Sequence, residues 1–512
     1  MTAGVQAAAG RAASIDGALR AIAIALSIAM VAQLTFVPLS QNDFWLQSAI
    51  GRLIMQTGQI PGTVLFPFTW ARDFPFNAHE WLPSIAFHWL HETLGYDHLL
   101  FVQGALGLGL FALSVALAFR VGARLGVALA CGAIAMLVAN YRHYLRPELV
   151  VLLLFVAQFH VLALYRQRRR WPVLLLSVPL AVLWANSHGS FLLGPIVAAI
   201  FAVGEGIEAW RHAPRLTTRE RWRHGVAGGA PYALAAAAML AASMLNPLGA
   251  ELLRFALTLS ASEVTKTFVR EWNPTFSPVF IGEPGFFIFL GAAAASLATM
   301  ALSWRRLTAT DVLLLAAFLV LACLRMRYVV WFGFVALMVC ARLLGAVPWR
   351  AWFERAALGV SLAISVAGLA LSFEHGNAYG AYPYMAASSA FTLPMIEQLS
   401  RDDVKGNVLN SYELGAELIY RYHPKLQPSI DSRIDSYGDH YFLLHQKLLR
   451  DESLLLEFVD DFDVRYMLLM WRDFEALRAM GRLRQSWVIQ FADQKAVLLA
   501  RRSPPPPPQP AH

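Results

Sequence analysis

The sequence predicts a polytopic α-helical membrane protein of about eleven transmembrane helices with a C-terminal extracytoplasmic α/β domain. Of its 512 residues, 57% are hydrophobic and only 15% are charged, whereas soluble domains carry about 25% charged residues. Apolar segments recur throughout residues 1–372, and residues 373–503 are polar enough to form a separate domain. The first region is therefore expected to be the membrane domain.

Each apolar segment has about 15–20 residues, the length that crosses the hydrocarbon core as a helix. The first segment has the length of a signal peptide, but no small-x-small cleavage site precedes Gln41, so we expect it to remain as a span. Cys131, Cys323 and Cys340 lie inside apolar runs and indicate packing rather than disulfides. The expected spans lie near 20–39, 99–119, 125–140, 147–165, 172–186, 190–209, 228–246, 284–303, 310–324, 327–347 and 353–372.

Basic residues set the expected orientation. They cluster on alternate connections, such as 166–170 and 211–223, and the positive-inside rule makes those connections cytoplasmic. The same rule accounts for the net charge of +8 without a nucleic-acid partner. The other connections then face outward, and they collect the unusual polar residues Asp43, His79, Glu80, Arg142, His143, Arg146, Glu148, His188, Glu271, Arg325 and Arg327.

The first outward connection, residues 41–98, is long for a linker. Apolar residues recur at helical spacing from Leu46 to Ile54 and stop at Thr57-Gly58, and a second amphipathic segment starts near Trp81. We expect two helices that lie in the membrane interface and place Asp43 at the water–lipid boundary.

The C-terminal stretch 373–503 alternates strand and helix patterns. GNVLN, PSIDSRID and VRYMLLM are expected to form strands, and WVIQFADQKAVLLAR a terminal hairpin around Ala492-Asp493. Residues 504–512 are Pro-rich, and we expect a disordered tail. Asp431, Arg433, Asp435 and Tyr437 suggest either a segment that contacts a ligand or docks onto the membrane core, or an internal Asp–Arg network that holds loops.

Asp43 is the first candidate for chemistry. A carboxylate at the outer end of a span is costly unless it is paired or hydrated. The alternative is a helix N-cap, since Asn42 or Asp43 before an amphipathic helix is an ordinary helix start. The two roles are compatible.

His79 and Glu80 form a second candidate, for acid–base chemistry or acceptor support. The alternative is that Glu80 only occupies the first turn of a helix, where the dipole favours an acid. The HEW sequence lacks the HExxH spacing of zinc proteases. Asp43 and Glu80 together suggest a divalent metal such as Mg²⁺ or Mn²⁺, because hard cations take carboxylate oxygens.

Arg142, Arg146, Arg325 and Arg327 lie on the side where the positive-inside rule disfavours them. One reason is an anionic ligand, a phosphate or pyrophosphate held by guanidinium groups, to which His188 would also donate. The alternatives are ion pairs with Glu148, Asp43 or Glu271, contact with anionic lipid, and a structural role for His188.

The local pattern NDFWLQSAIGRLIMQTGQIP, HEWL, WANSHGSF, NPLG, NxYxxG and DxRxDxYG resembles a bacterial group of GT-C fold glycosyltransferases. This superfamily includes oligosaccharyltransferases, protein mannosyltransferases and aminoarabinose transferases. The resemblance implies that Asp43 acts as general base or orients the acceptor nucleophile, and that Arg142, Arg146, Arg325 and Arg327 bind the donor phosphate. Residues 373–503 contain no WWD-type motif, which argues against N-glycosylation of sequons. Asp43 is preceded by Asn and is not followed by Glu, so the Asp-Glu pair of the protein mannosyltransferases is missing.

The implied function is transfer of a sugar, with inversion, from a polyprenyl-phosphate donor to an extracytoplasmic glycan, lipid or protein. Glu148 and Glu271 would support the site, and the protein would lie in the bacterial inner membrane in contact with membrane lipid. The alternatives are a non-catalytic envelope subunit, a transporter or flippase of lipid-linked substrates, and an enzyme like the O-antigen ligases. The sequence identifies neither the sugar nor the acceptor.

Overall fold

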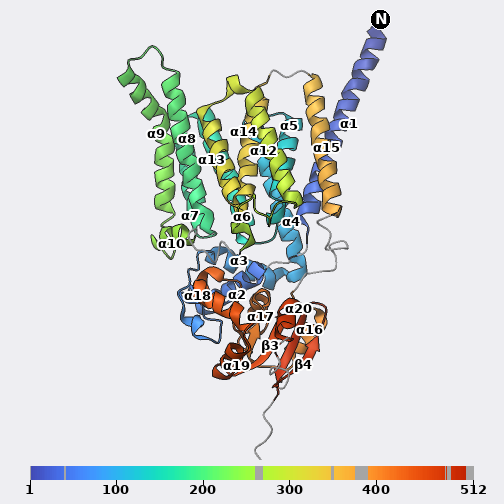
Figure 1. Cartoon of the computed structure of the whole chain (residues 1–512). Helices are drawn as coiled ribbons and strands as arrows, with labels where there is room; N and C mark the ends of the chain where they lie inside the picture. Colours follow the sequence, from blue (N-terminus) through green and yellow to red (C-terminus); the bar gives the residue numbers. More distant parts are fainter. Residues whose placement is uncertain are drawn as a thin grey trace, which may run out of the picture. The chain divides into compact units, whose positions relative to one another are not determined.

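The computed structural model describes residues 2–37, 39, 42–259, 269–347, 351–374, 390–478, 480 and 486–502; the predicted Pro-rich tail lies outside them. Contacts divide the chain into two compact units, drawn in Figure 1. The helical unit comprises Met1–Pro38, Asp97–Leu257 and Lys266–Met385. The mixed unit comprises Leu39–Tyr96, Thr258–Thr265 and Ala386–His512.

The helical unit is a bundle of apolar helices that run side by side (Figure 1). Among the described residues, eight helices are long and apolar enough to cross a membrane, and three apolar helices are shorter. A shorter one, α5, has 14 residues and spans about 21 Å, less than the hydrocarbon thickness of about 30 Å. Each expected apolar segment overlaps one of these helices, so the polytopic class is confirmed, while the count of eleven crossings stays a prediction.

The helices of this unit are α1 (Thr2–Thr35), α4 (Leu99–Arg120), α5 (Leu125–Val138), α6 (Pro147–Arg168), α7 (Ser177–Ala185), α8 (Leu193–Arg211), α9 (Thr218–Ala242), α10 (Glu251–Leu259), α12 (Pro284–Leu302), α13 (Ala309–Leu324), α14 (Val329–Gly345) and α15 (Ala351–Glu374). Short 3-10 turns connect several of them, including η3 (Asn140–Arg142), η5 (Gly189–Leu192), η6 (Arg270–Trp272) and η8 (Met326–Tyr328).

Helices α5 and α14 form the centre of this unit, because nearly every residue of both is buried. Small residues let them approach closely, and a Cβ at Gly333 would lie only 2.9 Å from Val138 Cγ1. An aromatic cluster continues the core, with Trp331 5.0 Å from Phe155 and 6.0 Å from Trp184 between ring centroids. This packed core supports the turns at the helix ends.

The mixed unit contains a five-stranded sheet in the order β2-β1-β3-β5-β4. Strand β1 pairs in parallel with β2 and β3, and β5 pairs antiparallel with β3 and β4. The expected strand VRYMLLM and the terminal hairpin are confirmed. The elements are β1 (Gly406–Asn410), β2 (Leu426–Pro428), β3 (Val464–Met470), β4 (Trp487–Ala492), β5 (Ala496–Arg501), α2 (Asn42–Thr57), η1 (Trp70–Asp73), α3 (Trp81–Leu94), α16 (Leu393–Ser400), η10 (Tyr412–Leu414), α17 (Gly415–Tyr422), α18 (Ile434–Leu448), α19 (Glu452–Asp461) and α20 (Trp471–Arg478). Turn η2 (Tyr96–His98) contains the boundary between the two units.

The expected strand PSIDSRID is wrong. Strand β2 ends at Pro428, and helix α18 begins at Ile434. Between them, Arg433 forms local hydrogen bonds with Asp431 in place of strand pairing. Its backbone N–H and its Nε each donate to Asp431 Oδ1 over 3.0 Å. This local pairing competes with strand formation.

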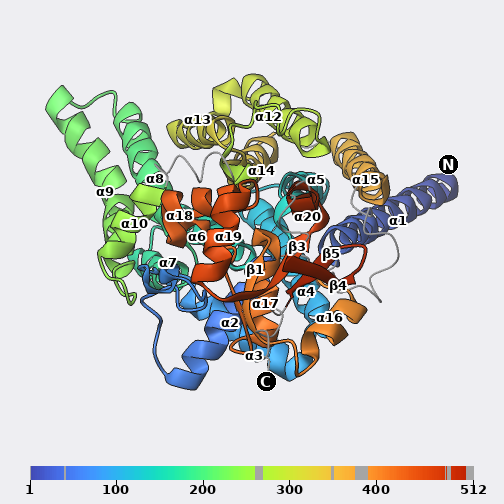
Figure 2. The same ribbon diagram turned by 60° about the horizontal axis from the view of Figure 1, so that its bottom comes forward.

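The two helices expected in the first outward connection are present as α2 and α3. The connection belongs to the mixed unit by its contacts, whereas the sequence division had placed it in 1–372. Figure 2 shows α2 beside α17, where Arg52 Nη1 donates to the carbonyl oxygen of Tyr420 over 2.8 Å. Further along, Phe68 N–H donates to the carbonyl oxygen of Pro428 over 3.2 Å. The loop is thus folded onto the sheet domain.

Candidate functional site

A cluster of charged side chains in the helical unit joins three connections between helices. Arg142 Nη1, in turn η3, lies 3.0 Å from Glu148 Oε2 and 2.6 Å from Glu271 Oε2. The other oxygen of Glu271, Oε1, lies 4.0 Å from Nη1 of Arg327 in turn η8. We call the series Glu148–Arg142–Glu271–Arg327 the arginine network.

Hydrogen bonds tie the same turns together. The Tyr141 hydroxyl donates to the carbonyl oxygen of Met326 over 2.7 Å, and Met326 N–H donates to the carbonyl oxygen of Asn273 over 3.0 Å. At the start of α6, Pro147 occupies a position where its missing N–H costs little, and Glu148 lies in the first turn, which favours an acid. Backbone geometry therefore supports the ion pairs.

The electrostatics of the network favour the ionised forms of Glu271 and Arg142. Burial alone would raise the pKa of Glu271, but Arg142, Arg327 and Arg146 outweigh it and hold that pKa well below its ordinary value. Burial alone would lower the pKa of Arg142, and the carboxylates of Glu148 and Glu271 raise it instead. Each buried charge is thus compensated by a neighbour of opposite sign.

One edge of Arg142 has no hydrogen-bond partner within the part of the chain that the structure describes. Its side chain is 1% exposed, and its Nε and Nη2 make no hydrogen bond to any described residue. The adjacent His143 is also buried, and burial lowers its pKa to about 3, so the ring is neutral. An unsatisfied buried donor costs about 1–3 kcal/mol, and more when charged. The Nε/Nη2 edge therefore has hydrogen-bonding capacity that no described residue uses.

The other predicted phosphate ligands differ in their surroundings. Arg146 lies close enough to lower the pKa of Glu271. Arg325 follows α13 and is half-buried, two residues before Arg327. His188 Nδ1 lies 2.8 Å from Ser190 Oγ and accepts from Ser190 N–H over 3.1 Å. These contacts fit the structural alternative for His188, within the turn that starts η5.

Tyr141 and Trp272 also belong to this cluster, although no sequence motif indicated them. Tyr141 joins turns η3 and η8, and the Trp272 ring lies under Arg327, with the guanidinium carbon 4.2 Å from the ring centroid. The sequence signal that could have indicated them is an aromatic residue directly next to a charged candidate, as Tyr141 is to Arg142 and Trp272 is to Glu271.

The acidic candidates lie in the mixed unit. Asp43 is half-buried in the first turn of α2, where the helix dipole favours a carboxylate. The Gln47 amide donates to Glu80, and Ser84 donates to Gln47. His79 Nε2 lies 3.8 Å from Glu80 Oε1. Glu80 is thus held by polar partners between α2 and α3.

A metal site does not follow from these contacts. In the part of the chain that the structure describes, no three His, Cys, Asp or Glu residues are grouped to hold a metal ion. The pair Asp43 and Glu80 does not by itself form a ligand set, and the Mg²⁺ or Mn²⁺ site stays a prediction.

The Asp431–Arg433 pair forms an internal network, as one of the two sequence alternatives proposed. Asp431 is fully buried and Arg433 is 5% exposed. Arg433 Nη2 also donates to the carbonyl oxygen of Val64 over 2.8 Å, and its guanidinium carbon lies 4.6 Å from the Phe76 ring centroid. The pair therefore fastens the loop to the sheet domain.

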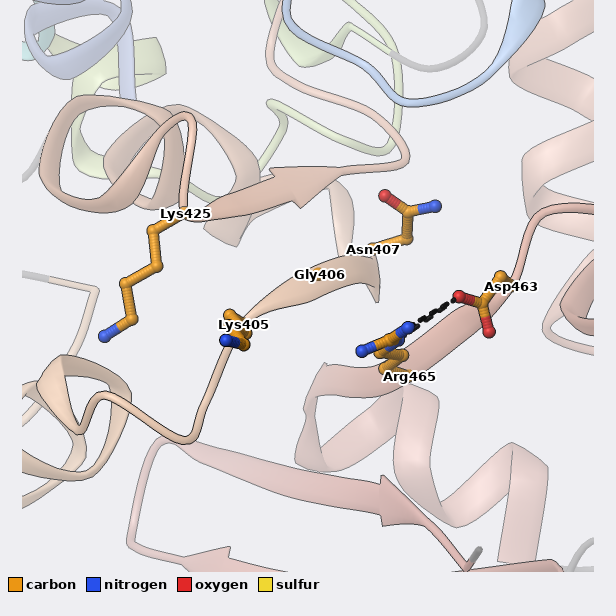
Figure 3. A pocket seen from close by; sticks show the side chains of 6 residues that line it. All are labelled: Lys405, Gly406, Asn407, Lys425, Asp463 and Arg465. Atoms are coloured by element: carbon orange, nitrogen blue, oxygen red, sulfur yellow. Dashed lines mark hydrogen bonds and ion pairs between the residues drawn. The ribbon is translucent and has the colours of Figure 1, made fainter. Parts of the chain in front are cut away.

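An open hollow of about 370 Å³ lies at the amino ends of β1, β2 and β3, and Figure 3 shows its lining. Lys425 Nζ donates to three carbonyl oxygens at the end of α16, at 2.7–3.1 Å. Arg465 pairs with Asp463 at 3.1 Å. Two of the three cations in this hollow, which also contains Lys405, are thus already bound to protein groups.

Comparison with known proteins supports the fold. No family profile and no curated protein matches the chain. The oligosaccharyltransferase of Archaeoglobus fulgidus, tethered to an acceptor peptide containing the NVT sequon, matches with a TM-score of 0.54 and 11% identity, over 94% of this chain and 74% of that chain. Its apo form matches with a TM-score of 0.50 and 11% identity, over 88% and 69%.

A third structure of that enzyme, with Zn and sulfate, has a TM-score of 0.50 and 13% identity, over 94% of this chain and 73% of that chain. The chain therefore has the GT-C fold, as its motifs indicate, and is a multi-pass membrane protein.

Proposed function

We propose that the protein is a membrane glycosyltransferase that moves a sugar from a polyprenyl-phosphate donor to an extracytoplasmic acceptor. The unpartnered Nε/Nη2 edge of Arg142 carries this proposal. Its two carboxylate partners occupy Nη1 and hold the guanidinium in place. A phosphate can then bind to the edge in the two-pronged geometry that favours arginine over lysine.

The cations of the arginine network support a phosphate leaving group. The network brings the guanidinium groups of Arg142 and Arg327 to the two oxygens of one carboxylate, Glu271. A sugar–phosphate–lipid diester carries one negative charge and its product carries up to two. Because the negative charge on phosphate grows as the anomeric bond breaks, fixed cations stabilise the transition state more than the bound donor.

In this proposal Asp43 accepts the proton of the acceptor hydroxyl. The acceptor oxygen forms a bond to the anomeric carbon as the bond from that carbon to the phosphate oxygen breaks, so the configuration inverts. General base catalysis of this kind contributes about 10²–10⁴-fold. The Archaeoglobus oligosaccharyltransferase carries an acceptor peptide; for this chain the acceptor is a glycan, lipid or protein of unidentified chemistry.

We place the protein in the bacterial inner membrane with its C-terminal domain outside the cytoplasm. The arginine-rich connections on one side support this orientation. The arginine network lies on turns of the opposite parity, the side on which lipid-linked sugars are consumed in this proposal.

Binding of undecaprenyl phosphate to the full-length protein in nanodiscs tests the donor site. Arg142→Lys keeps the charge but loses the fork, and we expect affinity to fall by about 10–100-fold, since a hydrogen bond to a charged group contributes about 1.5–3 kcal/mol. Arg168→Lys, an exposed residue at the other end of α6, is the matched control and should bind normally. Equal affinity of Arg142→Lys and wild type would contradict the proposal.

Asp43→Asn tests the proposed base. The variant should insert, fold and bind undecaprenyl phosphate normally but fail to transfer sugar from a native lipid-linked donor extract. Full transfer would exclude Asp43 as the base while leaving the donor site intact.

A further inference from the structure

Arg327 is held mainly by an aromatic ring, whereas Arg142 is held by ion pairs. Arg142 makes two close ion pairs, whereas Arg327 Nη1 lies 4.0 Å from Glu271 Oε1. Its main contact is the indole of Trp272, 4.2 Å from the guanidinium carbon to the ring centroid. Trp272 is itself 7% exposed, so the ring is fixed by its surroundings.

This arrangement orients a cation without consuming its donors. A ring stacked on the face of a guanidinium leaves the N–H groups in the plane free to point outward. The carboxylate of Glu271 attracts the same group from a distance beyond a hydrogen bond. No described residue forms a side-chain hydrogen bond with Arg327, and its side chain is 16% exposed.

We infer that Trp272 and Glu271 are positioning residues that aim the N–H edge of Arg327 at the donor phosphate. The inference rests on the proposed function for the role of Arg327, and it adds two residues that act through it. Arg142 fixes Glu271 at 2.6 Å, and Glu271 and Trp272 are adjacent in η6. The contacts of Arg142 and Arg327 thus meet in the same turn.

The geometry also predicts a specific order of effects. Loss of the ring should free Arg327 to adopt other rotamers, because only the long contact to Glu271 would remain. Loss of the ring should leave Arg142 unchanged, since its close ion pairs and the Tyr141–Met326 hydrogen bond remain.

Arginine labelling with phenylglyoxal, quantified by peptide mass spectrometry on the full-length protein in nanodiscs, tests the arrangement without any ligand. Trp272→Phe keeps an aromatic face, and Trp272→Leu keeps an apolar side chain without one. We expect labelling of Arg327 to be close to wild type in Trp272→Phe and several-fold faster in Trp272→Leu. Trp304→Leu, which removes a ring 5.1 Å from Arg305, is the matched control and should leave Arg327 unchanged.

Affinity for undecaprenyl phosphate is the second readout. Trp272→Leu should bind about tenfold more weakly, and Trp272→Phe should recover most of the loss. The double variant Trp272→Leu/Arg327→Gln should be no weaker than Arg327→Gln alone, because Trp272 acts through Arg327. Melting temperatures identify any variant that fails to fold. Because Trp272→Phe and Trp272→Leu both place an apolar side chain at the same site, a difference between them reports the aromatic ring.

The outcomes separate the inference from the proposed function. Equal labelling of Arg327 in the Phe and Leu variants would overturn the inference, since packing alone would then explain Trp272. If labelling changes as expected but wild-type protein binds no undecaprenyl phosphate, the positioning of Arg327 stands and the donor assignment fails.

Discussion

Replacing Arg433 by Gln should release the first outward loop from the sheet domain. Arg433 is 5% exposed and pairs with fully buried Asp431, with Nη2 2.5 Å from Oδ2. The substitution leaves that carboxylate buried without its cation and removes the 2.8 Å hydrogen bond to Val64. Loss of one partner of a buried ion pair costs about 3–5 kcal/mol, so the loop should open far more often.

The chain contains its own control at the same spacing. Asp463 and Arg465 are also two residues apart and pair at 3.1 Å, but they are 70% and 56% exposed. Exposed pairs contribute about 0–1 kcal/mol, because water solvates each partner when the other is removed. Arg465→Gln should therefore have little effect on stability or on loop opening.

Hydrogen exchange measured by mass spectrometry on the purified full-length protein reports this opening. The amides of Val64 and Phe76 donate to Phe74 and Gly62 at 3.0 and 2.9 Å, so they exchange only when the loop opens. A loss of 3 kcal/mol corresponds to about 100-fold faster exchange. Exchange within about threefold of wild type in Arg433→Gln, or equal acceleration in Arg465→Gln, would refute the reasoning.

Two further predictions concern the mixed unit. Gly51→Ala should lower the melting temperature, because a Cβ there would overlap the carbonyl oxygen of Ser84, where α2 crosses α3, and such overpacking costs about 1–3 kcal/mol. The control Gly62→Ala places its Cβ in open space and should leave the melting temperature unchanged. Equal melting temperatures of the two variants would contradict the close crossing. Burial lowers the pKa of His445 to about 4, so the unfolded chain takes up a proton between about pH 6.5 and 4 that the folded chain does not. As the pH falls over this range, the free energy of unfolding of the wild type should decrease by up to about 1.4 kcal/mol per pH unit. In denaturation measured at several pH values, His445→Gln should show a smaller decrease. An equal decrease in both proteins would show that His445 is not the titrating group.

Local patterns in the sequence were enough for the membrane-helix class and for parts of the sheet. Apolar runs mark helices because a span must bury its backbone polar groups internally and face lipid with apolar side chains. The strand Val464–Met470 and the terminal hairpin follow from alternation and a turn at Asp493. The expected strand at 428–435 failed because Asp431 and Arg433 pair with each other, a contact that strand propensity does not include.

The sequence was enough to list the polar residues of the candidate site, but not to predict which of them form ion pairs with one another. Positive-inside counting placed Arg142, Glu271 and Arg327 on one side, and both an anionic ligand and internal ion pairs were open alternatives for them. Only the folded structure decides that Arg142 bridges two carboxylates with one nitrogen and leaves the other edge unpartnered. That choice depends on three loops meeting at the ends of packed helices.

By itself, the sequence determined the helical membrane class and the apolar segments, because both depend on residues near one another in the chain. The side of the membrane on which the unusual charges lie stays a prediction. Tertiary structure alone decided that residues 39–96 fold with the C-terminal sheet, and that Trp272 stacks on Arg327. These contacts join residues from separate elements, and their geometry is set by how the helices and strands pack rather than by any local pattern.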